Sequence, residues 1–462
     1  MGCCGTSEVK ENRNPNTPYQ NPIEIKTDQI NVQKNEPQEK DKQNINTQQN
    51  IVQTQLPKSK PNSCFDKELC KSIVASLPTR TDTTLTELKN IMKSKTGELS
   101  EKEKAFVIFI WISQNIDYDA ASYFAGRSVD CTPEGVFANG KTVCSGYSRL
   151  YKNIADFLGL EVECVTCYAK GVGYQPGDKM NSTNHEYNVI KLDDKWYPID
   201  STWGAGHIEG KDYVRQFVEF YFLSDPNLLI KTHFPQDERW QLGDQKYTLE
   251  QFLTWPHVRE KFNIYGFYKY TPEEGLIKLN GTNSYKFTIY TKDMDKKGVS
   301  CNVYFLQNNC YYQQLNLTLI NKFEDRFEFI CLFNKKGKYK VSLFANNDDS
   351  TKYYGIIDYS VEVSKDAEQD LKFPKLYSGA NEITLIEPLY DNLKSGQKVK
   401  FKMQSKLEKI IILDGQWHYL TKNEQGFFEK DITIQTSKGQ NLCIGKPTQA
   451  NSMSYLYCFT IC

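Results

Sequence analysis

The sequence has no excess of charge of either sign, because 57 Lys and Arg residues balance 57 Asp and Glu residues. A protein whose main task is to bind nucleic acid needs a net basic surface, so this balance argues against that class. The sequence also lacks any run approaching the ~18 consecutive apolar residues of a transmembrane helix. Its first residues lack the apolar segment of a secretory signal. These absences predict a soluble chain that does not bind nucleic acid.

Metal-binding patterns are also scarce. The 462 residues contain only five histidines, and Cys164 and Cys167 form the one C-x-x-C motif. No second such motif or histidine pair stands at the spacing of a zinc site, so we interpret these two cysteines as residues of a buried strand. The 14 cysteines are scattered along the chain, unlike the dense cysteines of a small disulfide-stabilised domain. We therefore expect neither a metal nor a cofactor.

The first 62 residues differ in composition from the rest of the chain. They contain a single aromatic residue, Tyr19, and are rich in Asn, Gln, Lys, Pro and Thr. Such a segment cannot bury enough apolar surface to offset the entropy that ordering would cost. We therefore predict that residues 1–62 are a disordered tether.

This tether begins with a lipidation motif. Met1-Gly2-Cys3-Cys4-Gly5-Thr6 fits the N-myristoylation pattern M-G-x-x-x-[ST], with Gly2 as the acceptor. One myristoyl chain holds a protein to a membrane only marginally, and palmitoylation of Cys3 and Cys4 would supply a second signal. The motif thus predicts a cytoplasmic protein, peripheral on the cytosolic face of a membrane, where thiols stay reduced. The alternative is a chance match in a disordered tail.

Helical periodicity predicts helices over residues 84–95 and 101–116. A third helix is predicted to begin at Cys144, because apolar and aromatic residues recur after it at helical spacing: Tyr147, Leu150, Tyr151, Ile154, Ala155 and Leu158. Gly159 is the expected end of this helix. A helix N-terminus stabilises a thiolate and offers backbone N–H groups to a developing oxyanion. Cys144 is therefore a candidate nucleophile, although most isolated cysteines are simply small buried hydrophobic residues.

Two more residues join Cys144 in a candidate catalytic triad. Residues 161–167, 185–192 and 195–200 have the pattern of strands, and Asp193-Asp194 indicates a hairpin turn between the last two. Because side chains alternate across a strand, His185 and Asp200 fall on the same side of this hairpin as neighbours. A cysteine nucleophile, a histidine base and an acid that orients the histidine make a complete triad.

Three sequence blocks resemble those of the transglutaminase-like cysteine-protease superfamily, and above all its kyphoscoliosis peptidase type. They are Gly140 with Cys144-Ser145-Gly146-Tyr147, Asn184-His185-x-Tyr187-Asn188, and Trp196-Tyr197-x-Ile199-Asp200-Ser201-Thr202-Trp203-Gly204. The resemblance covers roughly residues 65–265. It implies that Cys144 is the nucleophile, His185 the base and Asp200 the orienting acid. The sequence differs from the pattern at Tyr187, where many members have Trp.

The C-terminal half has a different pattern, with alternating strands, turns and no long helical period. Tyr285, Phe287 and Ile289 alternate with polar residues, for example. We predict two immunoglobulin-like β-sandwich modules, residues 267–366 and 367–462, after a papain/transglutaminase-like domain of residues 63–266. The expected fold class is α+β, and binding or positioning is the expected role of the two modules.

The sequence therefore predicts a thiol peptidase or acyl-transferase that acts on protein substrates at a membrane surface through a Cys-His-Asp triad. Water as the acyl acceptor makes such an enzyme a hydrolase, and an amine makes it a transglutaminase; the resemblance favours hydrolysis. The expected partners are a protein substrate or binding partner, including a cytoskeletal one, and the membrane. The alternative function is that of a catalytically inactive transglutaminase-like scaffold that binds cytoskeletal or membrane-associated partners.

Overall fold

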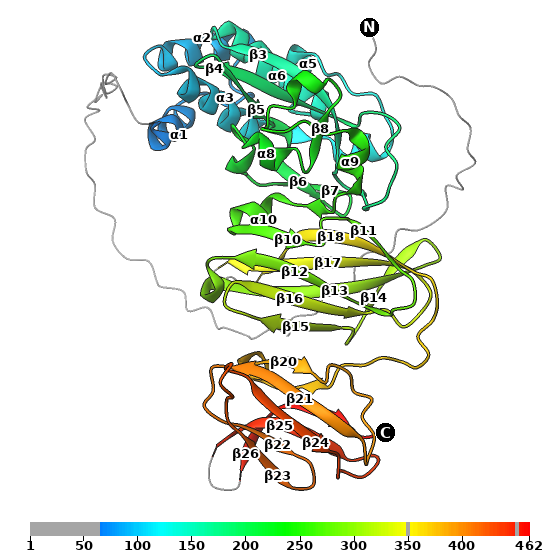
Figure 1. The fold of residues 1–462 in the computed structure, drawn as a ribbon. Coiled ribbons are helices and arrows are strands. Elements are labelled where there is room, and N and C mark those ends of the chain that lie inside the picture. Colours follow the sequence, from blue (N-terminus) through cyan, green and yellow to red (C-terminus); the bar gives the residue numbers. More distant parts are fainter. Residues whose placement is uncertain (1–64, 348–351, 449–451) are drawn as a thin grey trace, which may run out of the picture. The chain divides into compact units, whose positions relative to one another are not determined.

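The computed structural model describes residues 65–347, 352–448 and 452–462 (Figure 1). The lipidation sites expected at Gly2, Cys3 and Cys4 lie outside the described residues, as does the tether expected over residues 1–62, and both stay predictions. Within the described ranges, no helix combines the length and the apolar character needed to cross a membrane.

Four of the longer helices build the N-terminal part of the described chain: α1 (Lys67–Ala75), α2 (Leu85–Thr96), α3 (Glu101–Asn115) and α6 (Cys144–Phe157). The helices predicted over residues 84–95 and 101–116, and the one predicted to begin at Cys144, are confirmed. Both α2 and α3 begin with a capping box, which satisfies backbone N–H groups that have no partner within the helix. α3 is buried continuously over residues 105–113, and α1 and α6 pack against it.

Shorter elements lie between these helices and after them. They are β1 (Asp117–Tyr118), α4 (Ala120–Phe124), α5 (Pro133–Asn139), β2 (Lys141–Thr142), α7 (Ser201–Ala205), β6 (Gly206–Glu209), β7 (Asp212–Arg215), η1 (Glu219–Tyr221), α8 (Pro226–Leu229), η2 (Glu238–Trp240) and α9 (Leu249–Thr254). β1 and β2 pair in parallel, so Tyr118 lies opposite Thr142, two residues before Cys144.

A four-stranded sheet with the order β5-β4-β3-β8 belongs to this part of the chain. Its strands are β3 (Glu161–Ala169), β4 (His185–Leu192), β5 (Lys195–Ile199) and β8 (His233–Pro235). Asp193 and Asp194 adopt positive φ angles of 48° and 60°, as a two-residue hairpin turn requires. The three predicted strands are confirmed, with one correction. β5 ends at Ile199, and Asp200 is the N-cap of α7, because its carboxylate accepts backbone N–H groups of the next turn.

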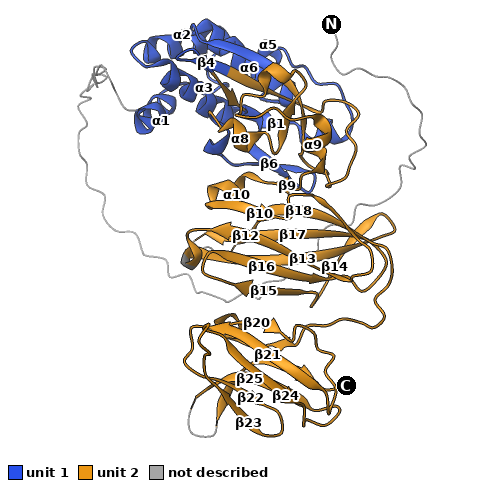
Figure 2. Ribbon diagram, viewed as in Figure 1, with its two compact units in different colours: residues 1–164, 190–195, 200–222 blue, residues 165–189, 196–199, 223–462 orange. Residues whose placement is uncertain are grey.

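Contacts divide the chain into two compact units (Figure 2). Among the described residues, unit 1 comprises those up to 164 together with residues 190–195 and 200–222, and unit 2 comprises the rest. The boundary between the units passes through β3, β4 and β5. Cys144 and Asp200 thus belong to unit 1, whereas His185 belongs to unit 2.

The first β-sandwich, in unit 2, contains two sheets. One has the order β10-β12-β16-β15 and the other β11-β18-β17-β13-β14. Their strands are β10 (Phe267–Thr271), β11 (Leu276–Leu279), β12 (Ser284–Thr291), β13 (Lys297–Gln307), β14 (Cys310–Gln314), β15 (Thr318–Lys322), β16 (Arg326–Leu332), β17 (Gly337–Asn347) and β18 (Tyr354–Val363), with η3 (Met294–Lys296) before β13. Apolar side chains from both sheets, including Phe287, Val341 and Tyr359, form the core. The predicted alternation around Phe287 is confirmed as strand β12.

A short segment before this sandwich is joined to it by backbone pairing. β9 (His257–Val258) pairs antiparallel with β18, so that Val258 lies opposite Ile357 and His257 opposite Asp358. α10 (Glu260–Ile264) follows and packs against β18 and β10. The part of the chain that belongs to the first sandwich therefore begins at β9, about ten residues before the start of β10.

The second β-sandwich, also in unit 2, has sheets of the order β19-β26-β25-β22-β23 and β20-β21-β24. Its elements are β19 (Lys375–Leu376), η4 (Ala380–Glu382), β20 (Ile383–Glu387), β21 (Lys398–Ser405), β22 (Ile410–Leu413), β23 (Trp417–Leu420), β24 (Phe428–Thr433), β25 (Asn441–Pro447) and β26 (Met453–Thr460). Cys443 and Cys458 lie directly opposite each other on β25 and β26, and they form a disulfide. Strand pairing brings their Cα atoms to 4.1 Å. The cytosolic location expected from the lipidation motif stays a prediction.

Candidate active site

Cys144 is the first residue of the 14-residue helix α6 and is half-buried. Val143 precedes the helix in an extended conformation, and its carbonyl accepts the N–H groups of Gly146 and Tyr147. The N–H groups of Cys144 and Ser145 therefore have no partner within the helix. They lie where a helix N-terminus carries its partial positive charge, which stabilises an anion next to it.

The remainder of α6 holds Cys144 in place. Its buried face carries Tyr147 and Tyr151, whose hydroxyl groups donate to the backbone carbonyls of Ile116 (2.8 Å) and Ala105 (3.1 Å). Gly146 allows the helix to begin against β2, because a Cβ there would lie 2.0 Å from the Thr142 hydroxyl oxygen. The position of Cys144 is thus set by a helix that two tyrosine hydroxyl groups, one turn apart, anchor to the surrounding backbone.

Asp200 is buried, with 1% of its surface exposed, at the start of α7. Its Oδ1 accepts hydrogen bonds from the backbone N–H groups of Thr202 (2.8 Å) and Trp203 (3.0 Å). The N–H of Asp200 donates to the carbonyl of Tyr221 at 3.0 Å. Backbone dipoles at a helix N-terminus compensate a buried carboxylate, so this position suits an ionised acid.

Tyr118 lies near Cys144 and Asp200, and no motif in the sequence marks it as a site residue. It is half-buried on β1. Burial raises the pKa of Tyr118 far above its usual value, and the nearby negative charges of Cys144 and Asp200 raise it further. Tyr118 therefore remains protonated and can donate a hydrogen bond. A two-residue strand leaves no periodic signal, so only the three-dimensional arrangement identifies this tyrosine.

His185, in unit 2, is the first residue of β4 and is buried. The residue before it, Asn184, fixes the start of the strand: its side-chain amide accepts from the N–H of Ala169 (2.7 Å) and donates to the carbonyl of Ala169 (2.9 Å). The His185 ring packs edge-to-face against His233, with the ring centroids 5.2 Å apart. The structure thus places Cys144 and Asp200 in one unit and His185 in the other, and the triad stays a prediction.

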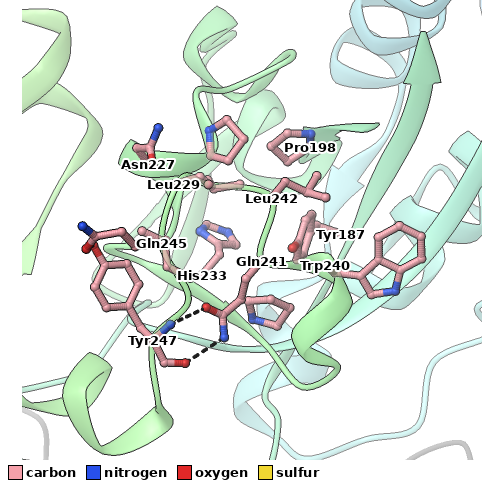
Figure 3. Close-up of a pocket in the computed structure, with 14 residues that line it drawn as sticks. Tyr187, Pro198, Asn227, Leu229, His233, Trp240, Gln241, Leu242, Gln245 and Tyr247 are labelled. Atoms are coloured by element: carbon pink, nitrogen blue, oxygen red, sulfur yellow. Dashed lines mark hydrogen bonds between the residues drawn. The ribbon is translucent and has the colours of Figure 1, made fainter. Parts of the chain in front are cut away.

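A pocket lies beside these rings within unit 2 (Figure 3). Figure 3 shows His233 among the side chains that line it, with Tyr187, Pro198 and Trp240 nearby. None of the side chains that line this pocket carries a formal charge at neutral pH when His233 is neutral: Tyr187, Pro198, Pro226, Asn227, Leu229, Ile230, His233, Pro235, Trp240, Gln241, Leu242, Gln245 and Tyr247. Gln241 holds one wall by bonding both the N–H (2.8 Å) and the carbonyl (2.9 Å) of Tyr247. The pocket is suited to an uncharged group.

The cysteines of the C-x-x-C motif lie on a strand, as the sequence analysis predicts. Cys164 and Cys167 are both residues of β3. A spacing of three residues along a strand directs two side chains to opposite faces of the sheet. This geometry does not suit a shared metal ion.

Comparisons with known proteins match two segments of the chain. Residues 89–201, which include Cys144, His185 and Asp200, match the transglutaminase-like superfamily. Residues 249–374 match the KY-like, immunoglobulin-like domain. The second match begins at α9 and includes β9, the strand that pairs with the first sandwich.

Three curated relatives match this chain over segments of 179 to 186 residues. Human kyphoscoliosis peptidase is 32% identical over 186 residues, which is 39% of this chain and 28% of that protein. Hillarin of Drosophila melanogaster is 32% identical over 179 residues, or 36% of this chain and 22% of that protein. Lim and transglutaminase domain protein ltd-1 of Caenorhabditis elegans is 28% identical over 183 residues, or 37% and 25%. The matched segments span less than a third of each relative.

The expected fold class agrees with these matches and with the structure, in which mixed helices and strands are followed by β-sandwiches. The resemblance to the kyphoscoliosis peptidase type is likewise confirmed. The chain contains a domain of the transglutaminase-like superfamily, followed by a KY-like, immunoglobulin-like domain.

Proposed function

We propose that this chain is a cofactor-free thiol enzyme that acts on protein substrates by acyl transfer, with Cys144 as the nucleophile, His185 as the base and Asp200 as the orienting acid. The observation that supports this best is the position of Cys144 at the N-terminus of α6. A half-buried thiol there is accessible and lies beside backbone N–H groups that stabilise its anion. The name peptidase given to relatives such as human kyphoscoliosis peptidase adds support.

In the proposed reaction, His185 takes the proton of the Cys144 thiol, and the thiolate attacks the carbonyl carbon of a substrate amide. The N–H groups of Cys144 and Ser145 bind the oxyanion of the tetrahedral intermediate. The C–N bond then breaks, His185 gives its proton to the departing amine, and a thioester remains on Cys144. Asp200 holds the imidazole in the orientation that both proton transfers need.

The acceptor of the acyl group decides the type of enzyme. Water, deprotonated by His185, attacks the thioester, releases a carboxylic acid and restores the thiol; this is a peptidase cycle. An amine in place of water gives a transglutaminase cycle. The similarity to kyphoscoliosis peptidase favours water.

The place of action in this proposal is the cytosolic face of a membrane. Myristoylation of Gly2, with palmitoylation of Cys3 and Cys4, would supply the two lipid signals that stable anchoring needs. Proteins at that surface, including cytoskeletal ones, would then be the substrates or binding partners. The sandwich modules offer sheet edges at which such proteins could bind.

Labelling with a thiol-directed active-site probe tests the proposal, with the modified cysteines identified by peptide mapping. Cys131 is a stringent internal control, because it is also half-buried in unit 1 and its sulfur accepts a hydrogen bond from the Ser145 hydroxyl at 3.1 Å, so it lies beside the same helix N-terminus. We expect Cys144 to react at pH 7 at least about tenfold faster than Cys131. Both His185→Ala and, to a smaller extent, Asp200→Ala should slow the reaction, and Cys144→Ala should abolish this label.

If Cys144 reacts no faster than Cys131, and no slower when His185 is replaced, the enzyme proposal fails. The chain would then be the inactive transglutaminase-like scaffold that binds its partners without chemistry. Circular dichroism of His185→Ala and Cys144→Ala provides the control for folding.

A further inference from the structure

His233 is one of the histidines that the proposed reaction does not use, yet its ring contacts the ring of His185. It is the first residue of β8 and is almost wholly buried, with 1% of its surface exposed. Positions as deeply buried as this one are usually occupied by apolar residues, because a buried imidazole needs a hydrogen-bond partner. The presence of histidine here therefore requires an explanation.

The backbone of His233 is fixed on one side by β3. His233 lies opposite Ala169 in the antiparallel pairing of β8 with β3. The N–H of Lys170 donates to the carbonyl of Thr232 at 2.9 Å and continues the ladder. Ala169 thus pairs with His233 and is also bonded by Asn184, the residue before His185.

The ring of His233 is fixed by Thr232. The Thr232 hydroxyl oxygen lies 2.8 Å from Nδ1 of His233 and 3.2 Å from the carbonyl oxygen of Leu229. The Leu229 carbonyl also accepts the backbone N–H of Thr232 at 2.9 Å, so Thr232 itself is held in place. Its hydroxyl group, hydrogen-bonded to Nδ1, therefore defines the rotation of the His233 ring.

The ring held in this way packs against two residues of β4. Its centroid is 5.2 Å from that of His185, with the planes at 68°, and 5.7 Å from that of Tyr187, with the planes at 77°. Both are edge-to-face arrangements, which are favourable for aromatic rings. His185 and Tyr187 are two residues apart and share a face of the strand, so one ring restrains both.

We propose that His233 is a positioning residue that, through its contacts with Thr232 and Tyr187, holds the imidazole of His185 in its working orientation. This inference rests on the proposed function, because it assumes that His185 is the base. On another side, His233 lines the uncharged pocket (Figure 3), so a group bound there would touch the same ring that touches His185. Binding of a group in the pocket would then change the position of the His233 ring and, through it, the orientation of the His185 ring.

Two measurements test this role on the full chain. The first is the rate constant for alkylation of Cys144 at pH 7. The second is the NMR signal of the His185 ring carbon Cε1, which is assigned by its loss in His185→Gln; with five histidines in the chain, few signals overlap. We expect His233→Ala to slow alkylation about fivefold, the order of one lost edge-to-face pair, and to broaden or split the His185 signal.

A matched pair at Thr232 separates positioning from simple packing. Thr232→Val keeps the shape but removes the hydroxyl that fixes the His233 ring, and it should reproduce part of both changes. Thr232→Ser keeps the hydroxyl and should restore wild-type behaviour. His207→Ala, at an exposed site on β6, is the control that should change neither measurement. If His233→Ala fails to fold, the Thr232 pair decides alone.

The outcomes are distinct. Wild-type rates and an unchanged His185 signal in both His233→Ala and Thr232→Val would overturn the inference while leaving the proposed function intact. A wild-type Cys144 that reacts no faster than Cys131 would instead refute the proposed function. The His185 signal would still show whether His233 holds the ring.

Discussion

Replacing Asp358 tests the reasoning about buried charge in the first sandwich. Asp358 is a β18 residue with 1% of its surface exposed. Its carboxylate accepts from the Ser342 hydroxyl at 2.6 Å and from Arg259 Nη2 at 2.5 Å. Lys340 Nζ lies 3.6 Å away, and His257 Nδ1 lies 3.9 Å away. Arg259 comes from the segment that joins the sandwich through β9, so its ion pair with this carboxylate adds to the backbone pairing that attaches the segment to β18.

The magnitude follows from the pKa of the Asp358 carboxyl group. Burial alone would raise this pKa, but the charges of Arg259 and Lys340 outweigh it and lower the pKa from 3.8 to about 2. A group whose pKa is lower in the folded state adds stability above its unfolded pKa and loses it as the pH falls towards the folded one. A pKa lowered from 3.8 to about 2 corresponds to about 2 kcal/mol of stability at pH 7.

We therefore expect Asp358→Asn to lower the free energy of unfolding at pH 7 by about 2 kcal/mol. Near pH 2 the difference from wild type should fall to a small fraction of its value at pH 7, because the folded-state carboxyl group is then about half protonated and that of the unfolded chain almost fully. Urea unfolding of the full chain, read by pulsed hydrogen exchange in peptides of β17 and β18, measures this locally. Asp370→Asn, at an exposed position, is the matched control. A loss at pH 2 as large as at pH 7 would show that shape, not charge, is responsible, and no loss at pH 7 would refute the reasoning.

Gly204→Ala should destabilise unit 1, because an added Cβ would lie 2.3 Å from Cζ of Phe109; a loss of about 1–3 kcal/mol is expected in urea unfolding, and an unchanged midpoint would contradict this packing. His257→Gln should make the first sandwich less sensitive to acid. Burial lowers the pKa of His257 from 6.5 to about 3, so wild type should lose about 2 kcal/mol between pH 6.5 and 5, and an identical loss in the variant would argue against it. Gly2→Ala should move the protein from membranes to the soluble fraction of cells, whereas Gly5→Ala, which keeps the motif, should not; equal fractionation of the two variants would mark the motif as a coincidence.

Local signals in the sequence were sufficient for the elements that carry the candidate triad. The apolar spacing after Cys144 predicts α6, and Asp193-Asp194 predicts the turn between β4 and β5, because both patterns depend only on neighbours along the chain. The prediction that Asp200 belongs to a strand is wrong by one residue. An Asp followed by Ser and Thr is typical of a helix N-cap, but the strand alternation that precedes Asp200 continues through it and hides this signal.

Other features leave no local signal. β9 is two residues long, too short for any period, and its partner on β18 lies far along the chain. The contact of His233 with His185 depends on β8 returning to β3, which spacing alone does not reveal. The disulfide between Cys443 and Cys458 likewise depends on the register of two strands. In each case the missing information is long-range pairing, whereas periodicity describes only a single element.

The pairing of β9 with β18 also sets an order of events during synthesis. His257 and Val258 leave the ribosome about 100 residues before their partners Asp358 and Ile357, a delay on the order of 5–20 s at usual elongation rates. During that interval, Arg259 has no Asp358 to bind, so the preceding domain can fold while its exit segment is still unattached. The first sandwich can be completed only when β18 emerges. From that point the segment at β9 is paired with β18, and the preceding domain is no longer free of the sandwich.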